Sequence, residues 1–180
     1  MIVFKPHLAL PESRQTPLLV SVEADKVDVA ELLILSGASV DTVSHPNVDT
    51  PLHLVKSVEL AQLLLDCGAS LTAKNAWHQT PLHCACKSGD VELVKCFVCF
   101  GADLDAKDQQ GRTALHCCAA SNTVTTAECL IEAGCDIEAA DSEGFSALEL
   151  AKLMAFHDVV KVISAHRRSP PPQPVFSAEK

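Results

Sequence analysis

The chain has 180 residues, of which 48% are hydrophobic and 21% charged, proportions typical of a folded, soluble protein. Its net charge is −9 and its longest basic run is Arg167-Arg168, so phosphate groups would be repelled and we expect no nucleic-acid ligand. Lys5-Pro6-His7 interrupts the apolar N-terminal run, so we expect neither a signal peptide nor a membrane span, and we place the protein in the cytoplasm, with the nucleus also open to it.

Residues 1–11 are the first element of the chain. Their apolar side chains show no helical period, although the segment is too apolar for a solvated tail. Two interpretations stay open: the segment covers the exposed end of the structure that follows, or it is a processed or alternative start. The apolar residues are Ile2, Val3, Phe4, Leu8 and Leu10.

Two short motifs recur along residues 12–167. The first is Thr or Ser followed two residues later by Leu, with spacings of 34, 30, 33 and 33 residues. The second is Gly followed by Ala or Cys, with the same period. Such a period indicates stacked repeats, each too small to bury its apolar face alone. The motifs begin at Thr16, Thr50, Thr80, Thr113 and Ser146, and at Gly37, Gly68, Gly101 and Gly134.

The Thr-Pro-Leu-His sequence at residues 50–53 and 80–83 resembles the opening of the ankyrin repeat, and the order of helix, turn, helix and Gly-Ala agrees with that family. The resemblance implies an all-α solenoid of about five helix-turn-helix repeats, joined by β-hairpin-like finger loops. It also implies a concave face, formed by the fingers and the first helices, that binds other proteins. We expect Leu52, Leu82 and Leu115 to line up along a common spine.

The first two repeats differ from the later ones. In repeat one, the second helix (residues 27–36) has an apolar stripe wider than that of a free helix, so we expect it to be packed on both sides. In repeat two, Thr50 to Val58 spans eight residues where other repeats have eleven, so its first helix should lose most of a turn. A shortened second repeat is also similar to the ankyrin-type inhibitors of cyclin-dependent kinases.

The turns inside the repeats need a left-handed backbone conformation. Gly89 provides it in repeat three, and Asp25 and Asn122, at the same position, are residue types that tolerate it. Repeat five has Ala155 there, and we expect that turn to differ.

His53, His83 and His116 occupy the same position of three repeats. Metal ligands must converge on one ion, whereas equivalent residues of stacked repeats lie about 10 Å apart. The resemblance implies instead that each histidine bonds its threonine and neighbouring backbone. Since the chain also shows no activated nucleophile, phosphate-binding loop or carboxylate pair, we expect no enzyme, no metal site and no cofactor.

Nine cysteines are present, an odd number whose spacings follow helix faces, so we interpret them as free thiols. Cys96 and Cys129 are expected to fill the core, because buried cysteine behaves as a small hydrophobic residue. Cys67 and Cys99 are expected on the surface, where they could be oxidised. On cysteine count alone, a thiol-based metal-binding or redox protein stays as the remote alternative.

Finger-tip residues and the end of the third repeat's first helix are not required by the stack. We take them as the candidate partner-binding set. Trp77, the only tryptophan, is either the anchor of that surface or a filler of the space left by the shortened second repeat. The set consists of Asn47, Asp49, Trp77, Gln79, Lys87, Gln109, Gln110, Arg112, Glu143 and Phe145.

Residues 168–180 form a proline-rich tail. Arg168, Pro171 and Pro174 fit an Arg-x-x-Pro-x-x-Pro ligand for an SH3 domain, and a plain solvated tail is the alternative. The sequence therefore predicts a monomeric, non-enzymatic interaction module, either an adaptor or scaffold or an occluding inhibitor. An inhibitor of a kinase or transcription factor is the alternative within the same class.

Overall fold

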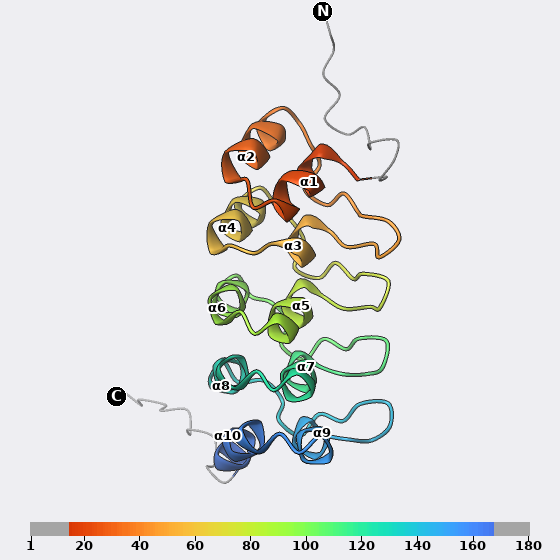
Figure 1. The fold of residues 1–180 in the computed structure, drawn as a ribbon, viewed down its shortest axis with the longest axis vertical. Coiled ribbons are helices and arrows are strands. Elements are labelled where there is room, and N and C mark those ends of the chain that lie inside the picture. The colour runs from red at the N-terminus through yellow and green to blue at the C-terminus, as the bar shows by residue number, and fades with distance from the viewer. Residues whose placement is uncertain (1–14, 168–180) are drawn as a thin grey trace, which may run out of the picture.

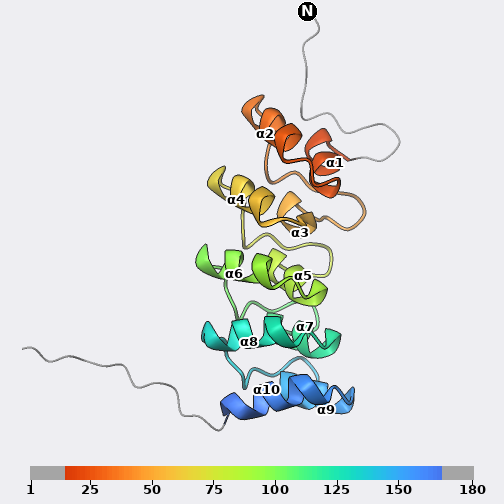
Figure 2. The same ribbon diagram turned by 60° about the vertical axis from the view of Figure 1, so that its left-hand side comes forward.

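The computed structural model describes residues 15–167, which form five stacked helix pairs joined by loops (Figure 1). The turned view in Figure 2 shows the same order of pairs, so the all-α ankyrin-type solenoid is confirmed. The inner, first helices are α1 (Pro17–Glu23), α3 (Pro51–Leu54), α5 (Pro81–Ser88), α7 (Ala114–Ser121) and α9 (Ala147–Leu153). The outer helices are α2 (Val27–Leu35), α4 (Val58–Asp66), α6 (Val91–Cys99), α8 (Val124–Glu132) and α10 (His157–Arg167).

Each inner helix begins at a threonine or serine in extended conformation, and α1, α3 and α5 have proline in their first turn. Proline suits this place because its missing N–H has no partner within the helix anyway. The longest described helix, α10, has 11 residues, and none of the helices in residues 15–167 is long and apolar enough to cross a membrane.

One leucine of each inner helix forms a continuous spine through the stack. These side chains are 0–4% exposed, and each inner helix contacts the next. Burying one leucine contributes about 1.5–3 kcal/mol, so the aligned row is a main source of stability. The expected alignment of the equivalent leucines is thus confirmed. The spine consists of Leu18, Leu52, Leu82, Leu115 and Leu148.

The shortened second repeat is also confirmed, since α3 has 4 residues where α5 has 8. The missing turn leaves the end of α5 without a neighbour on the side of α3, although α7 covers its other side. A hollow of about 330 Å³ lies there, lined by Val55, Lys56 and residues 88–90 together with Leu93. A smaller hollow of about 100 Å³ adjoins it, between α3 and α5. We call these two spaces the α3 notch.

Three expectations were wrong: those for the packing of α2, for the burial of Cys129 and for the turn at Ala155. Helix α2 is not packed on both sides: Val29 is 49% exposed and Leu32 is 65% exposed, because no outer helix precedes α2 in residues 15–167. Cys129 is only partly buried, since it packs against the core from its edge, whereas Cys96 is buried as expected.

The turn of repeat five does not differ from the others. Ala155 has φ 58°, close to the 57° of Asn122 and the 51° of Asp25. The backbone N–H of Phe156 donates to Ala151 O at 3.0 Å, as Asp90 N–H does to Ala85 O at 3.2 Å in repeat three. The hydrogen bonds that end the helix therefore impose the left-handed conformation even on an alanine.

Candidate functional site

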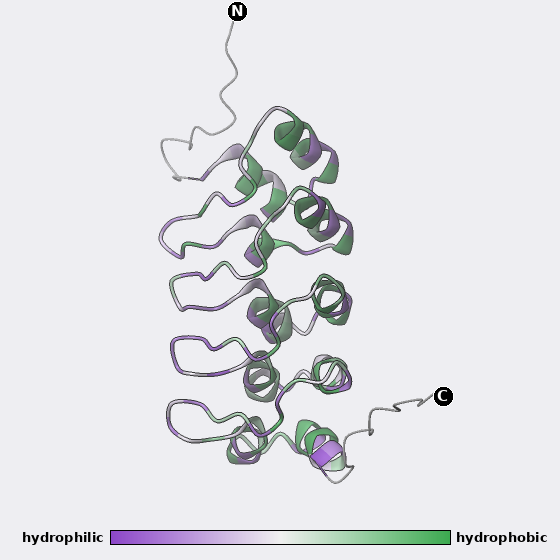
Figure 3. Cartoon of the chain, turned by 180° about the vertical axis from the view of Figure 1, so that it is seen from behind, coloured by the Kyte–Doolittle hydropathy of each residue, from purple (hydrophilic) through white to green (hydrophobic). Residues whose placement is uncertain are grey.

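Four loops project from the inner-helix side of the stack (Figure 1), and we call them fingers one to four. They comprise residues 41–49, 74–79, 107–112 and 140–145. Viewed from behind, they are mostly hydrophilic, in contrast to the helices (Figure 3).

A side chain at the base organises each of fingers two, three and four. In finger three, Asp108 Oδ1 accepts the backbone N–H groups of Gln110 and Arg112, each at 2.9 Å. Asn75 and Asp141 accept the corresponding N–H groups in fingers two and four. These bonds fix the shape of each loop from within.

Neighbouring fingers are also joined to each other by backbone hydrogen bonds. Each bond connects the tip of one finger to the tip of the next, so the four loops form one ladder. A partner would therefore meet a surface whose backbone is already ordered. The bonds run from Ala76 N to Asn47 O (2.8 Å), from Gln109 N to Trp77 O (3.0 Å) and from Ser142 N to Gln110 O (2.9 Å).

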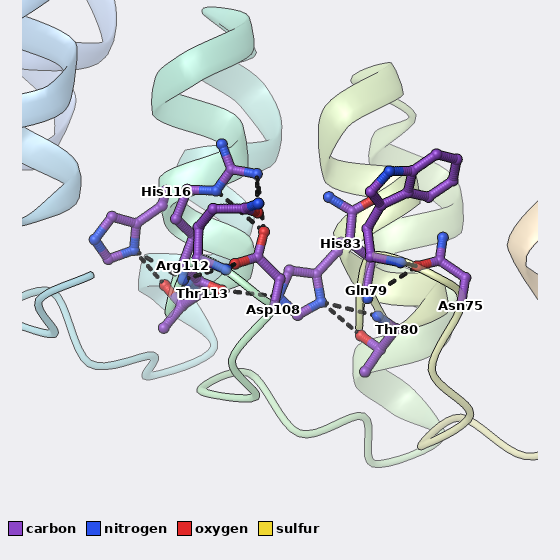
Figure 4. Close-up of polar contacts among 10 residues, drawn as sticks. Asn75, Gln79, Thr80, His83, Asp108, Arg112, Thr113 and His116 are labelled. Atoms are coloured by element: carbon purple, nitrogen blue, oxygen red, sulfur yellow. Dashed lines mark hydrogen bonds and ion pairs between the residues drawn. The ribbon is translucent and has the colours of Figure 1, made fainter. Parts of the chain in front are cut away.

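The histidines of the inner helices tie the fingers to the stack (Figure 4). His83 Nδ1 accepts the backbone N–H of Thr80 at 3.2 Å and its hydroxyl at 2.8 Å. This leaves the proton on Nε2, which donates to Arg112 O at 3.1 Å. His53 and His116 make the same contacts, so the expected local bonding is confirmed.

Burial lowers the pKa of all three histidines, because an imidazolium would lose its hydration there. They are thus neutral structural groups at physiological pH. Within residues 15–167, no group of three His, Cys, Asp or Glu side chains is placed to hold a metal ion.

Arg112 and Asp108 form an ion pair at the base of finger three (Figure 4). The guanidinium Nε and Nη2 lie 3.0 and 2.9 Å from Asp108 Oδ2, and Nη2 also donates to Gln110 Oε1 at 3.0 Å. Burial raises the pKa of Asp108, but the N–H groups and guanidinium of Arg112 outweigh it, so the pKa is lowered overall. The guanidinium group of Arg112 is thus held in one orientation.

The structure divides the candidate residues into three groups. Asp49 and Gln79 are buried: the Asp49 carboxylate accepts Asn75 Nδ2 at 2.9 Å, and Gln79 O accepts His53 Nε2–H at 2.8 Å. These two residues hold the fingers and offer a partner no surface. Asn47 and Arg112 are partly buried. The exposed residues are Trp77, Lys87, Gln109, Gln110, Glu143 and Phe145.

Trp77 is the largest exposed side chain of the fingers. It is 45% exposed, and Phe145 on finger four is 38% exposed. Trp77 lines neither hollow of the α3 notch, which stays open. The indole therefore does not line the space that the filler interpretation assigns to it.

The sequence analysis missed the α3 notch as part of this face. The notch has an apolar floor that includes Leu93 and a polar rim formed by Lys56, Ser88 and Asp90. The sequence feature that indicates this notch is the three-residue shortening of repeat two. From it, an open recess beside Lys87 could have been inferred.

Most cysteines are poorly suited to thiolate chemistry. Burial raises the pKa of Cys84 to about 11 and those of Cys117 and Cys135 to about 12, so these thiols stay protonated at neutral pH. Cys67 and Cys99 are exposed, as expected.

Comparison with known families gives the same repeats. The family described as ankyrin repeats (3 copies) matches residues 52–141 and 82–170, and the single ankyrin repeat matches residues 13–45. The chain belongs to the ankyrin-repeat family. Ankyrin repeats are protein–protein interaction modules and are generally non-enzymatic.

A curated ankyrin-repeat relative is "Ankyrin repeat and SOCS box protein 9" from Mus musculus. It is 43% identical over 70 residues, which are 37% of this chain and 23% of the mouse protein. The match therefore spans less than a quarter of that relative's length.

Proposed function

We propose that this ankyrin-repeat protein binds one partner protein, without catalysis, through a face made of the four fingers and the inner helices. The observation that carries the proposal is the exposed Trp77 on a finger whose backbone is bonded to both neighbouring fingers. The repeat does not need an indole there for its own packing.

The physical basis is preorganisation. Ordering a loop upon binding opposes association, and the finger ladder has already ordered these loops. Trp77 and Phe145 supply apolar contact area, while Gln109, Gln110 and Glu143 form a polar surround. This arrangement resembles interfaces in which a few large side chains carry most of the binding free energy.

The adaptor form of the proposal gives the protein two binding elements. The tail motif of Arg168, Pro171 and Pro174 lies outside the described residues, and an SH3 domain is the partner that fits its spacing. Holding two partners raises their effective concentration toward each other. The mouse relative's name likewise joins ankyrin repeats to a second module. A monomer in the cytoplasm is the state we propose.

The inhibitor form is favoured by the α3 notch. A recess with an apolar floor and charged rim can take a projecting side chain of a kinase or transcription factor and so cover that partner's surface. This form does not require the tail.

Affinity capture from cell lysate with full-length protein, followed by mass spectrometry, tests the proposal. A partner recovered by wild type and by Thr125→Ala, a substitution exposed on the outer helix α8 and outside the fingers, but depleted at least about tenfold with Trp77→Ala, supports the finger face. Equal recovery with both variants contradicts it. The Pro171→Ala/Pro174→Ala variant separates the two forms, because only an adaptor would lose a second, SH3-containing partner.

A further inference from the structure

The N-terminal end of the stack exposes a position that every later repeat buries. The third residue of α2 is Val29, which is 49% exposed. The third residues of α4, α6, α8 and α10 are 0–3% exposed, because the outer helix of the preceding repeat contacts each of these helices. The buried counterparts are Leu60, Leu93, Thr126 and Val159.

Val29 belongs to an apolar groove between α1 and α2. The groove measures about 360 Å³ and is lined mainly by apolar side chains, including Val20, Ala24 and Leu33, with Lys26 at its edge. Val20 is itself 37% exposed. We call this the α1–α2 groove; apolar surface of this kind in a folded protein marks a site that something covers.

We propose that the apolar segment of residues 2–10 of the same chain packs in the α1–α2 groove and closes this end of the stack. Only residues 11–16 lie between this segment, which we call the strap, and Pro17, which lines the groove. Fourteen residues can extend about 45 Å, whereas the nine residues of α2 are about 14 Å long. The segment can therefore reach all of the groove.

The composition of the segment matches the groove in two respects. Five of the nine residues 2–10 are large apolar side chains, among them Ile2 and Phe4, and they would replace the missing outer helix as the cover of Val29. The single lysine of the segment, Lys5, is opposite in charge to Asp28 and Glu31, which are exposed on α2.

Terminal repeats need a cover because a solenoid buries its core only between neighbours. The strap therefore has a second consequence: it occupies an apolar surface through which two copies of the chain could otherwise associate. The finger face then remains as the surface offered to partners.

Hydrogen exchange on the full-length protein tests the proposal, with the double variant Ile2→Ser/Phe4→Ser. These substitutions lie outside the repeats, so they leave repeat folding intact. We expect amide exchange in α1 and α2 to become at least about fivefold faster while exchange in α7 to α10 stays unchanged. Leu35→Ser is the matched control, because Leu35 is 78% exposed and its counterparts in α4, α6 and α8 are exposed too.

Nuclear Overhauser effects give the direct measurement. Contacts between the Phe4 ring and the Val29 methyl groups in the wild-type chain support the strap. Unchanged exchange in the double variant overturns the proposal. So does a wild-type dimer in sedimentation that Val29→Asp converts to a monomer, since a second copy would then occupy the groove.

Discussion

His83 of α5 donates its Nε2–H to the carbonyl oxygen of Arg112, 3.1 Å away at the base of finger three. The other ring nitrogen accepts two bonds from Thr80, the residue that begins α5. One imidazole thus joins the start of an inner helix to the finger of the next repeat. Because His53 and His116 repeat this contact, the position of the fingers is coupled to the stacking of the helices.

His83→Ala should lower the free energy of unfolding by about 2–3 kcal/mol. The substitution removes the acceptor of the Thr80 N–H and the donor to Arg112 O, and unpaired buried polar groups cost about 1–3 kcal/mol. Urea unfolding measures the change. His78→Ala is the control, since His78 is exposed on finger two, and it should change stability by less than about 0.5 kcal/mol. Equal losses in both variants would show that the histidine-to-finger bond has no special role.

Stability should fall as the pH is lowered from 7 to 5. Burial lowers the folded-state pKa of His53, His83 and His116 below the ordinary 6.5, so below pH 6.5 the unfolded chain binds more protons than the folded one. The stabilisation that the neutral histidines provide is complete above the unfolded-state pKa. It is lost as the pH falls toward the folded-state pKa values. Urea unfolding at several pH values measures it. His83→Gln should make this slope shallower, because the variant lacks one of the three buried imidazoles.

Much of the fold could be predicted from the sequence because its markers are local and periodic. Thr80, Pro81 and Leu82 act within one helix, as cap, first-turn residue and core residue, and their recurrence gives the stack. The short α3 could be predicted for the same reason, by counting residues between two markers.

The features that could not be predicted depend on neighbours across the repeats. Asp49 is buried because Asn75, 26 residues later, donates to it, and no local pattern indicates that bond. Val29 is exposed because, within residues 15–167, no outer helix precedes α2 to cover the position that the later repeats bury. At Ala155, the hydrogen bonds that end α9 impose a left-handed backbone conformation that alanine by itself disfavours.

Gly111→Ala should destabilise the protein more than Gly144→Ala. Both glycines have positive φ, +73° and +88°, so alanine is strained at either by about 1–2 kcal/mol. At Gly111 the added Cβ would also lie 2.6 Å from Ser142 Oγ and 2.8 Å from Ser142 N, whereas nothing lies within 4 Å at Gly144. The difference in unfolding free energy between the two variants measures the close approach of fingers three and four. A difference of zero would contradict that approach.

Ala155→Gly should stabilise the protein by about 0.5–1 kcal/mol. Alanine at φ 58° is strained by about 1–2 kcal/mol, and glycine is not, although glycine adds freedom to the unfolded chain that offsets part of the gain. Thermal and urea unfolding measure the change. Ala139→Gly, a loop substitution at a position outside the positive-φ region, is the comparison and should bring no gain.

Trp77→Ala should weaken partner binding by about 2 kcal/mol or more while leaving the melting temperature nearly unchanged. The indole is 45% exposed and lines neither part of the α3 notch, so its loss opens no cavity in the core. The backbone of Trp77, which accepts Gln109 N–H and donates to Asn75 Oδ1, is the same in the variant, and the finger ladder should persist. Calorimetric titration with the captured partner, beside thermal unfolding, separates the two quantities. A large drop in melting temperature with unchanged affinity would assign Trp77 to the stack instead of the interface.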